Sequence, residues 1–291
     1  MKDIDNLLQK REVQAIIRLA LAEDGFRQDV TSKLVIPVRM ESQAILLAKA
    51  DGVLSGIGVC AAVFKCVDSN LKVDVCKTDG NRLKTGDTVA VISGNTRAIL
   101  CAERTALNFV CHLSGVASAT AMYAESIKGT KARIADTRKT SAGHRQLEKY
   151  AIACGGGKNH RFNLSDGILI KDNHIAALQS KGISLGEVVA QAKKRNRSGL
   201  EIEVEVNSLT QVEEAVLAGA GMLLLDNMGI PEMRAAVSKF KGCVRFEASG
   251  GITLQNVRDV AETGVDIISV GALTHSVKAF DFSLEMSDLP L

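Results

Sequence analysis

Residues 201–206 read Glu201-Ile202-Glu203-Val204-Glu205-Val206, an alternation of carboxylate and branched aliphatic side chains. Alternation with period two predicts a β-strand that turns its carboxylates to one face and its aliphatic side chains to the other. A barrel strand packs its aliphatic face against helices, so the carboxylates are expected to point inward. An exposed edge strand is the alternative, because buried like charges are costly unless a cation or ligand hydroxyls meet them.

Three more strand-like runs follow, each leading into a helix-like stretch. Polar or small residues mark the ends of the four runs at intervals of about 22 residues: Glu205, Asp226, Ser249 and Gly271. That interval fits one strand plus one helix, so consecutive βα units and a parallel, barrel-like sheet are predicted. The carboxyl ends of barrel strands form the catalytic face, and these four positions are expected to converge there.

A basic segment precedes these units. Between Lys131 and His174 there are nine Lys or Arg residues and four acids, in a chain whose net charge is +3. Arg138 and Lys139 follow one apolar run and Lys171 ends another, so these cations are expected at strand ends. Arg binds carboxylates or phosphates with two parallel hydrogen bonds and Lys adds a compact charge. The segment therefore indicates a polyanionic small ligand, with a solvated basic face as the alternative.

Glycine-rich turns offer backbone N–H donors to such a ligand. Residues 155–157 are three glycines, which either approach a ligand closely or cap the helix expected over 141–153. The turns at 249–251 and 271–272 occupy the place where barrels commonly hold a phosphate, although ordinary tight turns also use glycine. Glu205 and Asp226 are candidates for contact with ribose or Mg²⁺.

The first third of the chain has a different pattern. An amphipathic helix is expected over residues 1–24, and a second helix over 96–113. Short strand-like runs separated by glycine turns lie between them, at residues 43–50, 53–58, 71–76 and 88–93. They predict a small strand-rich domain.

Composition excludes several classes of protein. With 291 residues, 46% hydrophobic and 24% charged, the chain has a globular composition rather than a disordered or fibrous one. The small net charge and an aromatic content of 3% argue against a nucleic-acid partner. Seven cysteines without a C-x-x-C pair indicate reduced thiols in a cytoplasm, and no apolar run is long enough to predict a membrane or secretory segment.

An ordered series of short motifs resembles the quinolinate phosphoribosyltransferase family, also called nicotinate-nucleotide pyrophosphorylase (carboxylating). The motifs are Glu103 to Asn108, Asp136 to Thr140, Gly155 to Arg161, Leu169 to His174, Glu203 to Glu205, Leu225 to Met228, Ser249 to Gly251 and Ser269 to His275. The resemblance implies an α/β protein with an N-terminal open α/β sandwich domain over residues 1–112, completed by the C-terminal tail 276–291. It also implies a C-terminal α/β barrel of the type II phosphoribosyltransferase kind over residues 113–275.

The resemblance further implies an activity. Such enzymes transfer the phosphoribosyl group of phosphoribosyl pyrophosphate to quinolinate with decarboxylation, giving nicotinate mononucleotide, pyrophosphate and CO₂ in NAD biosynthesis. They work with Mg²⁺ as homodimers or hexamers that share active sites. The quinolinate carboxylates would be held by Arg138, His160, Arg161 and Lys171, with Arg104 reaching in from a partner subunit.

The remaining roles that the resemblance implies concern the second substrate. Lys139, Glu205 and Asp226 would serve phosphoribosyl pyrophosphate and its Mg²⁺, which is bound mainly through the substrate, and together with Lys171 they would be the catalytic residues. The 5′-phosphate and the neighbouring substrate groups would be held by Ser249, Gly250, Gly251, Gly271, Ala272 and Leu273.

Two positions depart from the family pattern, since Ala142 and His144 stand where Pro and Leu are usual. Three other functions stay open. One is that of a paralogue associated with molybdenum transport, and another is a Schiff-base aldolase with Lys171 as nucleophile. The third is a phosphate-binding protein without turnover.

Overall fold

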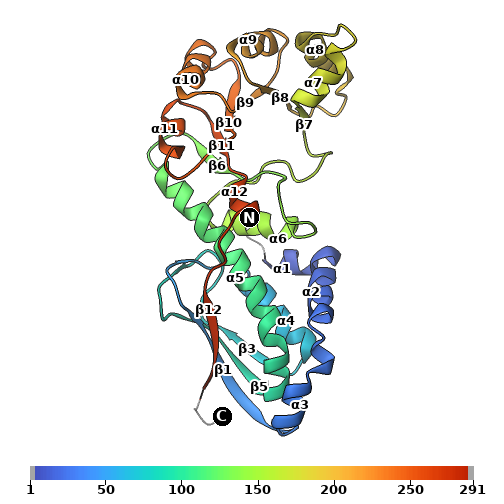
Figure 1. Ribbon diagram of the computed structural model, residues 1–291, viewed down its shortest axis with the longest axis vertical. Helices are drawn as coiled ribbons and strands as arrows, with labels where there is room; N and C mark the ends of the chain where they lie inside the picture. Colours follow the sequence, from blue (N-terminus) through green and yellow to red (C-terminus); the bar gives the residue numbers. More distant parts are fainter. Residues whose placement is uncertain (1–3, 288–291) are drawn as a thin grey trace. The chain divides into compact units, whose positions relative to one another are not determined.

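The computed structural model describes residues 4–287, and contacts between residues divide this part of the chain into two compact units. We call residues 4–121, 140–156 and 272–287 the sandwich unit, and residues 122–139 and 157–271 the barrel unit. Figure 1 labels the elements of both. Residues 1–3 of the expected first helix and residues 288–291 of the expected tail lie outside the described part.

The sandwich unit is built on a four-stranded antiparallel sheet in the order β12-β1-β5-β3. Its strands are β1 (Glu41–Ala48), β3 (Lys72–Val75), β5 (Thr88–Asn95) and β12 (Phe282–Ser287). Along β1, buried Ala44, Leu46 and Ala48 alternate with partly exposed residues, which gives the sheet one core-facing side. The C-terminal strand β12 pairs with β1 from Gln43↔Ser287 to Ala48↔Phe282, so the tail completes this sheet as the resemblance implied.

Helices supply the rest of the sandwich unit. The helix expected over residues 1–24 is present as two, α1 (Ile4–Gln9) and α2 (Arg11–Glu23). The second buries Val13, Ile17 and Leu21, which recur every four residues on one face. The short helices η1 (Phe26–Gln28) and α3 (Val30–Val35) follow.

The strand expected over residues 53–58 is wrong. Only Gly52–Val53 forms a strand, β2, which pairs with β4 (Arg82–Leu83). Gly56 then takes φ +90°, a left-handed conformation that glycine adopts without strain, and begins α4 (Ile57–Val67). Almost every residue of this helix is apolar except Lys65, so its sequence gave no clear helical periodicity.

The expected domain boundary at residues 112 and 113 falls inside a long helix, α5 (Thr96–Ser126). The helix was expected to end near residue 113, but small residues continue it through a further three turns. The following helix α6 (Arg145–Cys154) makes its contacts in the sandwich unit, whereas the sequence grouped it with the barrel. Gly155 ends α6, and a Cβ there would lie 2.3 Å from the carbonyl oxygen of Ala117 on α5. Gly155 therefore serves the packing of the two helices.

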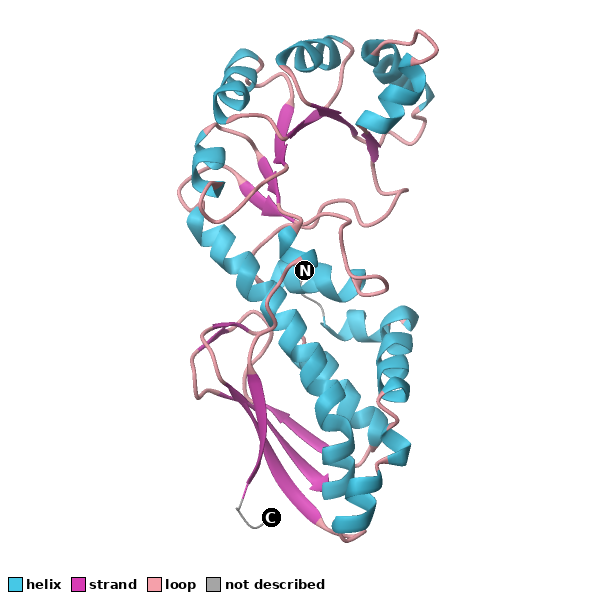
Figure 2. Ribbon diagram, viewed as in Figure 1, coloured by secondary structure: helices cyan, strands magenta, loops and turns pink. Residues whose placement is uncertain are grey.

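The barrel unit contains a six-stranded parallel sheet in the order β6-β11-β10-β9-β8-β7. Its strands are β6 (Arg133–Ala135), β7 (Ile168–Ile170), β8 (Ile202–Val206), β9 (Met222–Asp226), β10 (Arg245–Ser249) and β11 (Ile267–Ser269). Helices lie outside the curved sheet (Figure 2): α7 (Asp172–Gln179), α8 (Leu185–Arg195), α9 (Leu209–Leu217), α10 (Ile230–Lys239) and α11 (Val257–Glu262). The βα units predicted from the spacing are confirmed for β8, β9 and β10, whereas β11 leads only into the four-residue helix α12 (Ala272–His275) of the sandwich unit.

The sheet does not close by strand pairing. Among the described residues, β6 and β7 share no ladder, and β6 instead forms a single parallel bridge between Ala135 and Lys158. Lys158 N–H donates to Ile134 and its carbonyl accepts from Asp136 N–H. The segment after α6 therefore runs along the edge of β6 before the chain reaches β7. Within residues 4–287, no helix combines the length and the apolar character that crossing a bilayer requires.

A buried carboxylate ties α5 to α6 in the sandwich unit. Glu148 is fully buried, and its two oxygens accept hydrogen bonds from His112 Nε2 at 2.9 Å and from the Ser141 amide at 3.1 Å. Burial raises the pKa of Glu148, but these hydrogen bonds outweigh it and leave the pKa below the ordinary 4.5. His112 thus serves to satisfy a buried carboxylate.

We expect Glu148→Gln to lower the free energy of unfolding at pH 7 by about 2 kcal/mol, because it removes a charged acceptor from two buried hydrogen bonds. A carboxyl with a lowered folded pKa contributes its stability above the unfolded value and loses it as pH falls through the folded pKa. The difference from the wild type should therefore shrink below about pH 4.5 in urea unfolding curves. Glu125→Gln, an exposed change on α5, is the matched control, and an equal loss at all pH values would contradict the prediction.

Candidate active site

A cavity of about 430 Å³ opens at the carboxyl ends of the barrel strands. Every strand of the parallel sheet contributes residues at, near or just beyond its last position. From β11 this residue is Ser269, the last of the strand. The lining residues are Asp136, Thr137, Arg138, Lys139, His160, Arg161, Leu169, Lys171, Glu205, Leu224, Asp226, Asn227, Glu247, Ser249, Gly250, Gly251 and Ser269. The predicted convergence at one end of the sheet is therefore confirmed for Glu205, Asp226 and Ser249.

Strand register places these side chains at the same level. Asp226 pairs directly with Ser249, and Val206 pairs with Leu225. Neighbouring parallel strands in register end together, so residues at their carboxyl ends meet around one opening. Two of the three carboxylates expected to point inward do so: Glu203 is buried and Glu205 lines the cavity. Glu201 precedes β8, is exposed and pairs with Arg245.

Four cationic side chains share the cavity: Arg138, Lys139, Arg161 and Lys171. Burial lowers the pKa of Arg161, and the nearby charge of Arg138 lowers it further. Like charges held this close repel one another unless an anion lies between them. The cavity is therefore suited to a small molecule with several negative charges, which is the ligand class that the basic segment predicted.

The acidic wall has the opposite character. Burial raises the pKa of Glu205, and the negative charges of Asp226 and Asp172 raise it further against the opposing effect of Lys171. A smaller cavity of about 210 Å³ is lined by the same three carboxylates together with Asn207. Carboxylate and amide oxygens are the ligands that Mg²⁺ prefers, and a magnesium role for this wall stays a prediction.

Two turns at the cavity, one after β9 and one after β10, meet at Asn227 and Gly250. Asn227 has φ 53° and Gly250 has φ +90°, and a Cβ on Gly250 would lie 2.2 Å from Asn227 Oδ1. Gly251 also has positive φ, but a Cβ there would meet no atom within 4 Å. Only glycine fits at position 250, because the Asn227 side chain occupies the space of a Cβ.

The last predicted phosphate residues are not among those that line this cavity. Gly271 follows β11 and is not among the residues that line the cavity. Ala272 and Leu273 begin α12 (Ala272–His275) in the sandwich unit, and Leu273 is fully buried. Arg104 is exposed on α5, also in the sandwich unit. Its role, and those of Gly271, Ala272 and Leu273, stay predictions.

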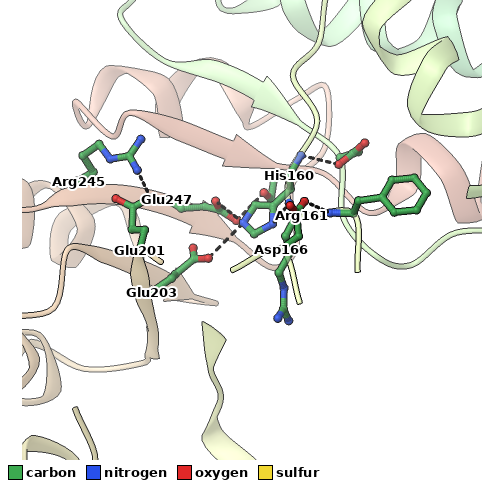
Figure 3. Close-up of polar contacts among 10 residues, drawn as sticks. His160, Arg161, Asp166, Glu201, Glu203, Arg245 and Glu247 are labelled. Carbon is green, nitrogen blue, oxygen red and sulfur yellow. Dashed lines mark hydrogen bonds and ion pairs between the residues drawn. The ribbon is translucent and has the colours of Figure 1, made fainter. Parts of the chain in front are cut away.

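His160 lies between two buried glutamates (Figure 3). Its Nε2 is 3.2 Å from Glu203 Oε2 on β8 and 3.2 Å from Glu247 Oε2 on β10. Burial alone lowers the pKa of His160, but the hydrogen bonds and charges of the two carboxylates outweigh it and raise the pKa. The Arg161 amide N–H donates to Nδ1 at 2.8 Å, which opposes a second proton there and assigns the ring proton to Nε2.

Sequence reasoning missed this cluster. Glu203 belongs to the predicted carboxylate face, but its partner His160 lies more than forty residues away in the chain. Glu247 stands between Phe246 and Ala248 in the strand-like run Val244 to Ala248, and an acid flanked by apolar residues was the available signal. His144, a departure from the family pattern, lies near Phe109 and His112 in another cavity, where burial and His112 lower its pKa.

Comparisons with known proteins agree with this site. Residues 29–114 match the family model described as "Quinolinate phosphoribosyl transferase, N-terminal domain", and residues 116–285 match the corresponding C-terminal domain. The chain belongs to the quinolinate phosphoribosyltransferase family. The two family domains meet at residue 115, inside α5, whereas contacts in the structure assign α5 up to residue 121 to the sandwich unit.

Relatives from plants and bacteria resemble the chain over most of its length. It is 39% identical to the chloroplastic nicotinate-nucleotide pyrophosphorylase [carboxylating] of Arabidopsis thaliana, over 94% of this chain and 83% of the relative. It is also 39% identical to the enzyme of that name from Mycobacterium leprae, over 93% and 95%. The crystal structure of NadC from Streptococcus pyogenes superposes with a TM-score of 0.90 at 39% identity, over 96% and 97% of the two chains.

We expect Gly250→Ala to destabilise this family member by about 2 kcal/mol, since its Cβ would collide with Asn227 and its φ would be strained. Gly251→Ala is the matched comparison, because it carries the φ strain without the collision and should cost about 1 kcal/mol. Urea unfolding at neutral pH measures both. Equal losses for the two variants would show that the contact with Asn227 contributes nothing.

Proposed function

We propose that this chain catalyses the transfer of the phosphoribosyl group from phosphoribosyl pyrophosphate to quinolinate, with decarboxylation to nicotinate mononucleotide. The supporting observation is that one barrel cavity is lined by four cationic side chains and by the carboxylates of Glu205 and Asp226. A pyridine dicarboxylate and a pyrophosphate ester are both polyanions, and the ribose ring becomes positively charged as it reacts. One site must therefore carry both kinds of charge.

The cations bind and orient quinolinate. Arg138, Arg161 and Lys171 hold its two carboxylates and direct the ring nitrogen at C1 of the ribose, with His160 at the same wall. Guanidinium groups suit this task, because each can grip a carboxylate through two parallel hydrogen bonds. Orientation of two bound reactants accelerates their reaction without any covalent contribution from the protein.

The acids act on the sugar. As the bond from C1 to pyrophosphate breaks, its electron pair leaves with pyrophosphate and positive charge develops on the ribose. Glu205 and Asp226 stabilise that charge, and Lys139 stabilises the departing phosphate oxygens. The two ends of the cavity are thus matched to the two charges that separate.

Decarboxylation follows from the new bond. Once the pyridine nitrogen is attached to C1 it is cationic, and it stabilises the electron pair left on C2 when the adjacent carboxylate departs as CO₂. A proton then takes the place of CO₂ at C2. No nucleophilic side chain is needed, which favours this reaction over a Schiff-base aldolase that would use Lys171.

The acidic wall also suits Mg²⁺ that arrives with phosphoribosyl pyrophosphate. Glu205 and Asp226 are the residues that would hold it, because both carboxylates line the cavity and the charge of Asp226 helps to raise the pKa of Glu205. The ion would supply charge neutralisation for the pyrophosphate group.

We expect EDTA to abolish turnover and added Mg²⁺ to restore it. Full activity after exhaustive chelation would contradict this role of the ion.

The reaction itself is tested by incubating the protein with quinolinate and phosphoribosyl pyrophosphate and measuring pyrophosphate and CO₂ release. We expect Arg138→Ala to lose at least about 100-fold in kcat/KM with little change in Tm, since it removes a charged carboxylate contact. Arg133→Ala, at the exposed amino end of the same strand β6, is the control. Binding of phosphoribosyl pyrophosphate without release of either product by the wild type would indicate a binding protein instead.

We further propose a homodimer, or a hexamer built of dimers, in which Arg104 completes the site of the partner subunit. Its exposure on α5 allows this contribution. Arg104→Ala and Arg138→Ala proteins should each be inactive, yet a mixture after subunit exchange should regain about a quarter of wild-type activity, because half the dimers then hold one intact site. No recovery despite exchange shown by mass spectrometry would rule out sharing.

Seven cysteines without a disulfide support a cytoplasmic location.

A further inference from the structure

We propose that Glu203 and Glu247 are positioning residues that fix the ring of His160, and through it Arg161, for recognition of the quinolinate carboxylates. The proposal rests on the proposed function for the identity of the substrate. It assigns to two buried acids, neither of which sequence analysis selected as a site residue, a share in substrate specificity.

The ring is held from inside the barrel through one nitrogen. Glu203 and Glu247 both approach Nε2 at 3.2 Å, and their side chains are only 8% and 1% exposed. Glu247 is fixed in turn, because its Oε1 accepts a hydrogen bond of 2.5 Å from the hydroxyl of buried Ser269 on β11. Residues of three strands, β8, β10 and β11, thus determine where the Nε2–H of His160 points.

The other side of the ring determines the backbone of Arg161. Nδ1 accepts the Arg161 amide N–H at 2.8 Å, and the His160 amide N–H donates to Oδ1 of fully buried Asp136 at 2.8 Å. The segment that carries both residues has no regular secondary structure. In a strand, hydrogen bonds to a neighbouring strand would fix the backbone and so the direction of the Arg161 side chain. Here the contacts of His160 fix it instead.

The arrangement costs stability, which argues that it serves the site. Two buried carboxylates face one N–H donor, and Glu203 Oε1 and Glu247 Oε2 both lack a hydrogen-bond partner among the described residues. A buried oxygen without a partner is uncommon and destabilising, and an apolar residue would fill a barrel core without that cost. Such costs are typical where residues are retained for function.

Precise direction matters here because of the chemistry of recognition. Arg161 and Arg138 lie close enough for their charges to interact within the cavity. A guanidinium grips a carboxylate with two hydrogen bonds only when its plane is aligned with the carboxylate plane. Loss of the His160 anchor should therefore weaken quinolinate binding selectively, and leave phosphoribosyl pyrophosphate binding at the acidic wall intact.

The kinetic test compares Glu247→Met, which cannot accept a hydrogen bond at that position, with Glu247→Gln, which can. We expect Glu247→Met to raise the KM for quinolinate at least about tenfold, with the KM for phosphoribosyl pyrophosphate within about twofold of the wild type. Glu247→Gln should recover a KM within about threefold of the wild type. Glu201→Met, at an exposed glutamate just before β8, is the matched control and should behave like the wild type.

Two kinetic outcomes would overturn the proposal. Equal defects in the Met and Gln variants would show that charge, not orientation, is what Glu247 supplies. A parallel rise in both KM values would show a general loss of structure. Should Glu247→Met fail to fold, the pair Glu203→Met and Glu203→Gln asks the same question at the second acceptor.

A spectroscopic test needs no substrate, so it separates failure of this proposal from failure of the proposed function. In protein labelled with ¹⁵N-histidine, His160 Nε2–H should give a proton signal protected from exchange, assigned by its loss in His160→Asn. Glu247→Met should shift or abolish that signal, and Glu247→Gln should keep it. An unchanged signal in Glu247→Met would overturn the proposal, as would a stoichiometric metal ion that the wild type retains and Glu247→Met loses.

Discussion

Electrostatic repulsion inside one cavity is the constraint on which the rest of the barrel unit depends. Arg138, Lys139, Arg161 and Lys171 are gathered at a single opening, and Glu205 faces them beside Asp226. Neither group would remain in place on a flexible surface, because like charges separate when they can. The parallel sheet prevents that, since its register ends neighbouring strands at one level and the charges other than that of Arg161 are attached at or near a strand end.

Periodicity in the sequence was sufficient to predict most of this architecture. The repeated interval from Glu205 to Gly271 predicted the βα units, and the alternation in 201–206 predicted which carboxylates point inward. Both signals are local, because strand and helix periods are properties of consecutive residues. Residues 53–58 misled for the same reason: a short apolar run fits a strand and a buried helix equally well, and the positive φ of Gly56 selects the helix.

Contacts between distant segments could not be predicted in that way. The position of Glu247 in a buried strand indicated nothing about His160, and neither residue has a periodic relation to Glu203. The extent of α5 was also underestimated, since the small residues around Ser118 show no amphipathic pattern in the sequence. In the structure these small residues allow other segments to approach the helix closely. Family resemblance supplied roles for residues, but the network behind them required coordinates.

The missing ladder between β6 and β7 has a consequence for the evolution of this scaffold. Insertion of a residue into a paired strand reverses the facing of every later side chain, and that penalty protects the other strands against change. An insertion within residues 157–167 does not carry this penalty, since the segment attaches to the sheet through the bridge at Lys158 and the contacts of His160. Variation in length and composition is therefore most readily tolerated along this border, so descendants with altered ligand preference would be expected to diverge there first.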